Sequence, residues 1–117
     1  MVSRSRTGRR NADRELDEAF GALSDSTRRK LIARLAEGPA MVTALAEPFA
    51  ISLPAVSRHL KVLESAGLIE RRIDGRTHYC SLAPRRLRDL QTWLDAYRPF
   101  WDETLDALSR YVERDTR

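Results

Sequence analysis

The 117-residue chain has a single cysteine, Cys80, and only two histidines. One cysteine excludes an intramolecular disulfide, and so few thiolate and imidazole ligands argue against a transition-metal site. No apolar run approaches the roughly 18 residues that a membrane-spanning helix requires. The basic residues 1–14 have no apolar segment behind them, so they do not form a secretory signal. We therefore expect no membrane partner, and a cytoplasmic location.

Catalytic groupings are also scarce. The sequence contains no Ser/His/Asp grouping, no glycine-rich phosphate loop and no pair of carboxylates at a useful spacing. A chain of this length also leaves little room for an active-site cleft. We therefore expect no enzyme, no cofactor and no bound metal. With 42% hydrophobic and 32% charged residues, the composition fits one modest globular domain.

Positive charge is concentrated in the first two thirds of the chain. The formal net charge is +4, and 19 of the 21 basic residues are arginine. Residues 1–14 carry five arginines against one acid, and residues 52–79 carry five basic side chains against three acidic ones. Residues 84–117 are balanced, with seven of each sign. This distribution favours an anionic partner, and arginine is suited to binding phosphate with two parallel hydrogen bonds.

Apolar spacing predicts helices from residue 14 onwards. Residues 1–13 lack apolar periodicity and are expected to form a disordered basic arm. Beyond them, apolar residues recur three and four apart and predict two helices joined by a cap cluster at 24–26. Residues 37–39 end the second helix. A short third helix over 42–47 is limited by Pro48, which removes a backbone donor.

The best-defined helix covers residues 52–66. Ser52 is a good N-cap, and Pro54 stands in the first turn, where its missing N–H costs nothing. Gly67 supplies the C-terminal stop. Two β-prone segments within residues 69–82 flank an Asp-Gly turn and predict a hairpin.

Apolar residues in the last third recur at heptad spacing over about four heptads. Pro99 interrupts the pattern, so we expect a kink or a break within residues 95–98. So long a stripe on a charge-balanced segment favours pairing with a second helix, and we expect a homodimer built from this segment and the first helix. The alternative is that the stripe packs only on its own domain. The residues expected at the dimer interface are Leu16, Phe20, Leu87, Leu90, Leu94, Tyr97, Trp101 and Leu108.

A short helix, a turn, a capped second helix and a basic hairpin make up the layout of a winged helix-turn-helix. Val56, Leu60 and Leu63 mark the buried side of the 52–66 helix, and Arg58 lies nearly opposite Val56. Such a helix fits the major groove of DNA, while a basic hairpin can neutralise flanking phosphates. The residues predicted to contact double-stranded DNA are Ser52, Leu53, Pro54, Ala55, Ser57, Arg58, His59, Lys61, Arg71, Arg72 and Arg76. For His59, a phosphate or packing role is favoured over base reading.

The stretches SDSTRRKLIARLAEGP and SLPAVSRHLKVLESAGLIERRIDGRTHYCSL resemble the ArsR-type family of dimeric winged-helix transcriptional repressors. The resemblance covers roughly residues 14–82. It implies a mostly helical fold with a small hairpin wing, and a homodimer that binds a palindromic operator and blocks transcription. The expected organisation is a basic arm, a DNA-binding domain over 14–83 and a dimerisation segment over 84–117.

The sequence departs from the metal-sensing members of that family. Those relatives carry a cysteine pair in the third helix or Asp and His on the last helix, whereas residues 41–44 hold no thiol and the last third holds no histidine. Leu53 stands where relatives often have glutamine, a base-reading side chain, so the resemblance gives less support for direct base reading at this position. Leucine can still contact a thymine methyl. The sequence does not name an effector. A second hypothesis is a winged-helix docking module without specific DNA binding, but the basic face of the 52–66 helix favours DNA.

Overall fold

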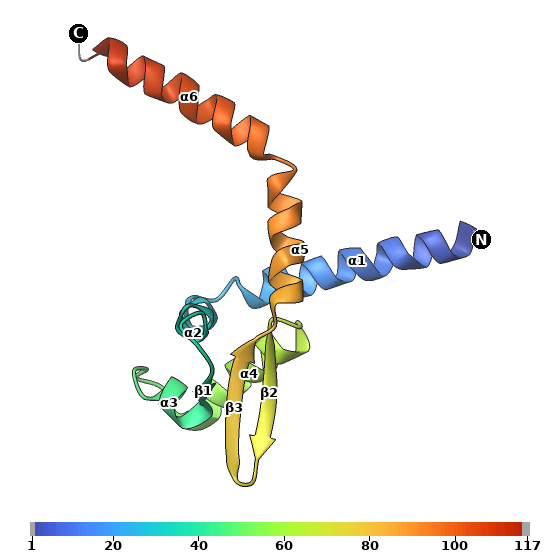
Figure 1. The fold of residues 1–117 in the computed structure, drawn as a ribbon, viewed down its shortest axis with the longest axis vertical. Helices are drawn as coiled ribbons and strands as arrows, with labels where there is room; N and C mark the ends of the chain where they lie inside the picture. Colours follow the sequence, from blue (N-terminus) through green and yellow to red (C-terminus); the bar gives the residue numbers. More distant parts are fainter. Residues whose placement is uncertain (1, 116–117) are drawn as a thin grey trace.

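The computed structural model describes the backbone of residues 2–115 and the side chains of residues 8–114. In Figure 1, a body of short helices and a β-hairpin lies below a crossing of α1 and α5, and α6 continues from the far end of α5. The described elements are, in chain order, α1 Val2–Ala22, α2 Ser26–Leu35, β1 Ala40–Met41, α3 Val42–Ala46, α4 Leu53–Ser65, β2 Ile69–Asp74, β3 Thr77–Leu82, α5 Pro84–Asp95 and α6 Arg98–Asp115.

Side-chain caps and glycines set the limits of α4 and the hairpin. The Ser52 hydroxyl accepts a hydrogen bond from the Ala55 backbone N–H at 3.3 Å, which satisfies one of the unpaired donors at the start of α4. After α4, Gly67 has φ +76°, and Gly75 in the hairpin turn has φ +64°. Both lie in the left-handed region that favours glycine. The predicted helix and hairpin are confirmed.

The core lies between α2, α3, α4 and the inner face of the hairpin. Val56, Leu60 and Leu63 of α4 are completely buried, as are Leu31 of α2 and Leu45 of α3. Burying each of these side chains contributes about 1.5–3 kcal/mol. Because the 3–4 spacing directs these residues inward, the opposite face of α4 is left to small and cationic side chains.

The sheet has one strand more than the sequence indicated. β1 pairs with β3, so that the strand order is β1-β3-β2, with Ala40 opposite Cys80 and Met41 opposite Tyr79. A strand of two residues is too short to show the alternation by which strands are recognised. Its pairing makes β3 the central strand and buries Cys80, which packs as a small apolar side chain.

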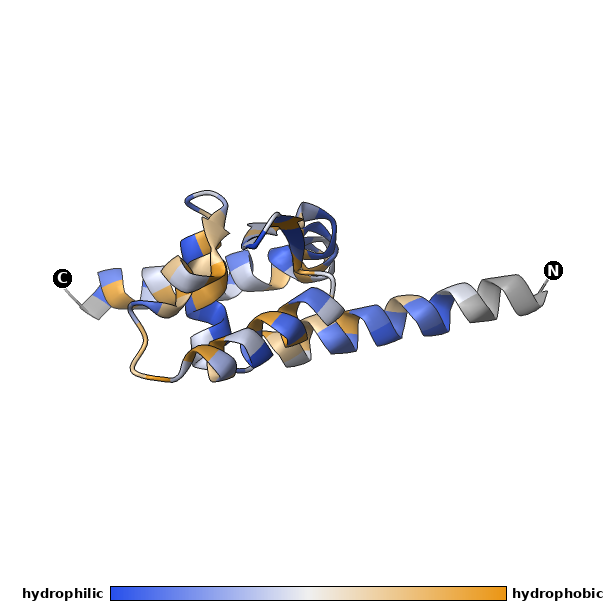
Figure 2. Cartoon of the chain, turned by 90° about the horizontal axis from the view of Figure 1, so that it is seen from below, coloured by the Kyte–Doolittle hydropathy of each residue, from blue (hydrophilic) through white to orange (hydrophobic). Residues whose placement is uncertain are grey.

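The basic arm was expected to be disordered, but its described residues are helical, because α1 begins at Val2. Met1 lies outside the described residues. No proline interrupts residues 2–22, so a helix anchored on the body at Ala19 and Ala22 continues towards the N-terminus. Figure 2 shows the outward part of α1 as mainly hydrophilic before its grey end, while hydrophobic residues gather where it meets the body.

The predicted break in the last third is confirmed. α5 ends at Asp95 and α6 begins at Arg98, with Pro99 in the first turn of α6, where no backbone donor is lost. Arg98 Nη2 donates to Asp95 Oδ1 at 2.9 Å across the break. Among residues 2–115, no helix is both long and apolar enough to cross a membrane.

Candidate nucleic-acid interface

The exposed face of α4 and the hairpin carry the residues predicted to contact DNA. Small and cationic residues share this face, on the opposite side of the helix from Val56 and Leu60. Seven are exposed, namely Ser52, Leu53, Pro54, Arg58, Lys61, Arg72 and Arg76. Four are half-buried, namely Ala55, Ser57, His59 and Arg71. The first seven are therefore free to meet a partner without any change in the fold.

Two hollows lie between α4 and the hairpin. One, of about 370 Å³, is lined by Leu53 and Ser57 of α4 together with Arg76 beside the hairpin turn. The other, which we call the α4–wing crevice, has about 330 Å³ and is lined by Ser57, Arg58, Lys61, Glu64 and Arg71. The fold thus brings predicted contact residues from two separate stretches of sequence onto one side of the molecule.

The three arginines of the hairpin have different environments. Arg76 is exposed next to the turn, and the Arg72 guanidinium lies 5.5 Å from the ring centroid of Tyr79 on the outer face. Arg71 shares the inner face with Cys80, its partner in the strand register, and its Nε lies 3.5 Å from Glu64 Oε2 of α4. Arg71 therefore turns towards α4 rather than outwards.

His59 belongs to a polar cluster that fixes α4 to the corner between α1 and α2. Arg28 Nε donates to the Ala22 carbonyl oxygen at 2.6 Å, and Arg28 Nη1 lies 3.2 Å from His59 Nδ1. His59 Nδ1 is also 3.8 Å from Asp25 Oδ2. The Arg28 backbone N–H donates to Asp25, and this bond is the main cause that lowers the pKa of Asp25. Desolvation opposes it, and the nearby charges of His59 and Arg28 add to the lowering. Of the two roles expected for His59, phosphate binding and packing, these contacts support packing.

Sequence reasoning missed the part played by Arg28. Its acceptors are mainly backbone carbonyls at the end of α1, Ala22 and Gly21, which no residue pattern identifies. Arg29 likewise donates to the Leu23 carbonyl oxygen at 2.8 Å. Two of the three cations that open α2 are therefore committed to holding the α1–α2 corner.

The predicted dimer residues fall into two groups. Leu90 is only 5% exposed and belongs to the core, while Leu16 and Leu87 pack against that core. Leu90, expected at the dimer interface, is therefore already buried within the single chain, where α5 uses this position to close its own domain. The other predicted residues are exposed, namely Phe20, Leu94, Tyr97, Trp101 and Leu108. Phe100, Leu105, Tyr111 and Val112 extend the same exposed apolar face along α6.

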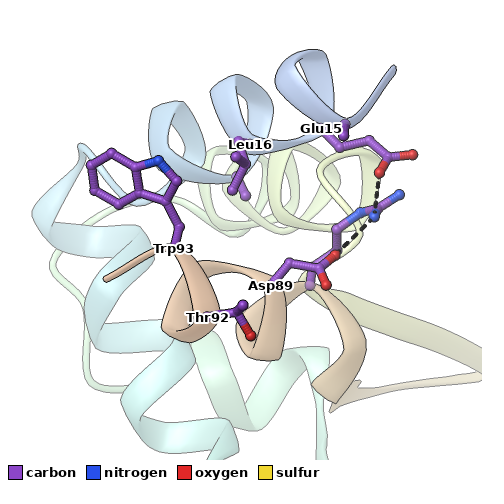
Figure 3. A pocket seen from close by; sticks show the side chains of 8 residues that line it. Glu15, Leu16, Asp89, Thr92 and Trp93 are labelled. Atoms are coloured by element: carbon purple, nitrogen blue, oxygen red, sulfur yellow. Dashed lines mark hydrogen bonds and ion pairs between the residues drawn. The ribbon is translucent and has the colours of Figure 1, made fainter. Parts of the chain in front are cut away.

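An aromatic cluster and an ion pair join α1 to α5. Trp93 packs edge-on against Phe20, with ring centroids 5.4 Å apart, and lies 4.9 Å from Tyr97. Trp93 also lines a cavity of about 330 Å³. Figure 3 shows Trp93 at one end of it and the ion-paired carboxylates of Glu15 and Asp89 at the other, with Leu16 between them.

Arg86 supplies the cation of that ion pair. Its Nη1 lies 2.7 Å from Glu15 Oε2 and 3.2 Å from Asp89 Oδ2. Partial burial alone would lower the pKa of Arg86, but its hydrogen bonds to these carboxylates raise it. The stem of Arg86 packs over Gly67, where an added Cβ would lie 2.8 Å from Arg86 Cγ. Arg86 thus connects α1 and α5 to the end of α4.

Within residues 2–115, no three His, Cys, Asp or Glu side chains are grouped so that they could hold a metal ion. Cys80 is buried, and this burial raises the pKa of its thiol, although the Arg71 charge opposes the shift. The thiolate form that metals and oxidants require is therefore disfavoured.

Helices α2 to α4 followed by a basic hairpin define a winged helix-turn-helix protein. Residues 23–72 match a family model described as a helix-turn-helix domain. The HTH-type transcriptional regulator Rv2034 of Mycobacterium tuberculosis is 41% identical over 100 residues, which are 86% of this chain and 91% of that protein. The transcriptional repressor SdpR of Bacillus subtilis is 37% identical over 79 residues, covering 68% of this chain and 88% of that protein.

Solved structures agree with these relatives. The crystal structure of an ArsR family transcriptional regulator, RHA00566, is 34% identical, with a TM-score of 0.71 over 77% of this chain and 93% of that one. A homodimeric winged helix-turn-helix DNA-binding domain from Mycobacterium bovis is 27% identical, with a TM-score of 0.60 over 70% and 78% of the two chains. The chain belongs to the ArsR family of winged helix-turn-helix transcriptional regulators.

Proposed function

We propose that this protein is a homodimeric repressor that places α4 in the major groove of a palindromic operator and the β2–β3 wing on flanking DNA. The observation that carries this proposal is the convergence of Arg58 and Lys61 of α4 with Arg76 of the wing on one exposed side. Membership in a family of transcriptional regulators supports a role that is not enzymatic.

The side chains of α4 suit two kinds of contact. Pro54 and Ser57 are small, so the helix backbone can approach the base edges closely, and Arg58 is long enough to read a guanine or bind a phosphate. Leu53, exposed in the first turn, offers an apolar contact to a thymine methyl. Lys61, Arg72 and Arg76 supply phosphate contacts, which set orientation and make binding sensitive to salt.

The exposed apolar face of α1, α5 and α6 supports self-association. Large side chains such as Trp101, Leu105 and Tyr111 are at least half exposed in the single chain, and contiguous apolar patches of this kind mark interaction sites. A two-fold pair would present two α4 helices to DNA, so that a palindromic site with half-sites about 34 Å apart, or a multiple of this, is expected. The homodimeric Mycobacterium bovis domain is consistent with this arrangement.

The test is DNA binding by an Arg58→Ala, Arg76→Ala double variant, measured by gel shift and footprinting on the region upstream of the protein's own gene. We expect affinity to fall about 10- to 100-fold and the slope of log K against log salt to become shallower by up to about 2. Arg34→Ala, which removes an exposed cation paired with Glu37 on α2, is the matched control and should bind like the parent. Unchanged affinity in a folded double variant would refute the proposed interface.

A further inference from the structure

The α4–wing crevice has the composition of an anion site. Three of its five lining side chains are cationic, namely Arg58, Lys61 and Arg71, and Glu64 is its one carboxylate. The formal charge of this lining is therefore +2. Ser57 adds a hydroxyl that can donate a hydrogen bond.

Arg71 is held in this crevice with two of its three guanidinium nitrogens lacking a hydrogen bond. Its Nε and Nη2 atoms are shielded from solvent and have no hydrogen-bond partner. Its ion pair with Glu64, at 3.5 Å, is longer than the 2.7–2.9 Å of a strong charge-assisted bond. Shielded donors without acceptors are unfavourable, so the inward position of Arg71 is weakly held.

We propose that the α4–wing crevice takes one backbone phosphate of duplex DNA, and that Glu64 limits DNA affinity because it holds Arg71 in the free protein. The inference rests on the proposed function. On DNA, Arg71 leaves Glu64 and donates its unused N–H groups to a phosphate oxygen, while Lys61 and Ser57 contact the same group. Arginine suits this exchange because its planar fork pairs with a phosphate as it does with a carboxylate.

This proposal gives Glu64 a role that a solvated surface carboxylate would lack. Its carboxylate lies on α4 one turn from Lys61 and 3.5 Å from Arg71 Nε, so it competes with an approaching phosphate for Arg71. Removing the charge releases Arg71 and should tighten binding, whereas loss of an ordinary stabilising ion pair would weaken the fold and leave affinity unchanged or lower.

The experiment measures the affinity of the full-length protein for a 30-base-pair duplex between 50 and 300 mM KCl. Glu64→Gln should bind about 2- to 5-fold more tightly at a given salt concentration. Arg71→Met should lose affinity, and its salt slope should fall by about 0.9, the effect of one phosphate contact. In the double variant, Glu64→Gln should gain less affinity than it does alone, because it acts through Arg71. The matched control is Glu70→Gln, a neighbouring acid on the outer face of β2, which should change affinity less than Glu64→Gln.

The outcomes separate the site from the function. If the parent binds duplex but Arg71→Met keeps the parental salt slope, the phosphate site is refuted and the DNA-binding role stands. An equal gain from Glu64→Gln with and without Arg71 would also refute it, since Glu64 would then act by direct repulsion. If Arg71→Met does not fold, Arg71→Lys takes its place, because it keeps the charge. The gain in affinity from Glu64→Gln is then measured in the Arg71→Lys background, and a gain equal to that in the parent refutes the site. A parent that binds no duplex refutes the proposed function and the inference together.

Free phosphate offers the same chemistry as a backbone phosphate, and a second measurement distinguishes the two. Inorganic phosphate, added at constant ionic strength, should leave the melting temperature of the parent and of Arg71→Met unchanged. A phosphate-dependent rise in the parent that disappears in Arg71→Met would assign the crevice to a free anion and overturn the duplex assignment.

Discussion

Replacing Gly67 by alanine tests the junction between the end of α4 and helices α1 and α5. Gly67 has φ +76°, a left-handed conformation that costs a non-glycine residue about 1–2 kcal/mol. The new Cβ would also lie 2.8 Å from Arg86 Cγ, so that the Arg86 stem has to move. Movement of the stem draws the guanidinium away from Glu15 and Asp89, and a partly exposed ion pair of this kind contributes up to about 1 kcal/mol.

Together these effects predict a loss of about 2 kcal/mol, and therefore a fall in Tm of about 8 °C for a domain of this size. Thermal unfolding followed by circular dichroism measures this loss at one fixed protein concentration, because the proposed dimerisation would make Tm concentration-dependent. Gly8→Ala is the matched control, since a Cβ there meets nothing within 4 Å in the middle of α1 and should be neutral or slightly stabilising. Adding Arg86→Ala to Gly67→Ala removes the clash but keeps the backbone strain. A Gly67→Ala protein that melts with the parent would refute this account of the junction.

Three further changes test the core, a helix cap and the dimer surface. Leu60→Ala empties a completely buried position and should cost about 2–5 kcal/mol in urea unfolding, whereas Val62→Ala, exposed on the same helix, should stay within about 0.5 kcal/mol. Because the pKa of Asp25 is lower in the folded chain than in the unfolded one, its contribution to stability is present above the unfolded value and is lost as pH falls through the folded value. The acid-induced loss of stability below about pH 4 should therefore be shallower in Asp25→Asn than in the parent. Trp101→Asp on α6 should shift sedimentation towards the monomer at micromolar concentration, and a parent that is itself monomeric would contradict the proposed dimer.

The helix 52–66 could be predicted well because local chemistry decides it. A hydroxyl N-cap at Ser52, a proline in the first turn, a glycine stop and an apolar stripe all indicate the same limits, and the structure places α4 within a residue of them. The break before Pro99 is predictable for the same reason. In contrast, β1 and the course of α1 before residue 14 depend on partners elsewhere in the fold, which no local pattern contains.

The candidate site was predictable as a surface but not in its internal contacts. The inward turn of Arg71 had a signal, since Ile69 is buried and successive odd positions of a strand share one face. Leu90, buried within the single chain, shows that a heptad pattern cannot distinguish packing within a chain from packing between chains. The Arg28 contacts had no signal at all, since their acceptors are mainly main-chain atoms brought near only by the α1–α2 corner.

Two arginines outside the proposed DNA-binding surface, Arg28 and Arg86, determine where α4 lies relative to α1 and α5. Arg28 holds the middle of α4, through His59, against the end of α1, and Arg86 packs over Gly67 at the end of α4 while pairing with α1 and within α5. A helix fixed at two points along its length can neither slide nor tilt freely against α1 and α5. In a two-fold dimer built on those helices, the distance between the two copies of α4 is then set by packing rather than by DNA. Such a dimer selects half-site spacing before it reads any base, because a site with the wrong spacing meets only one of the two helices.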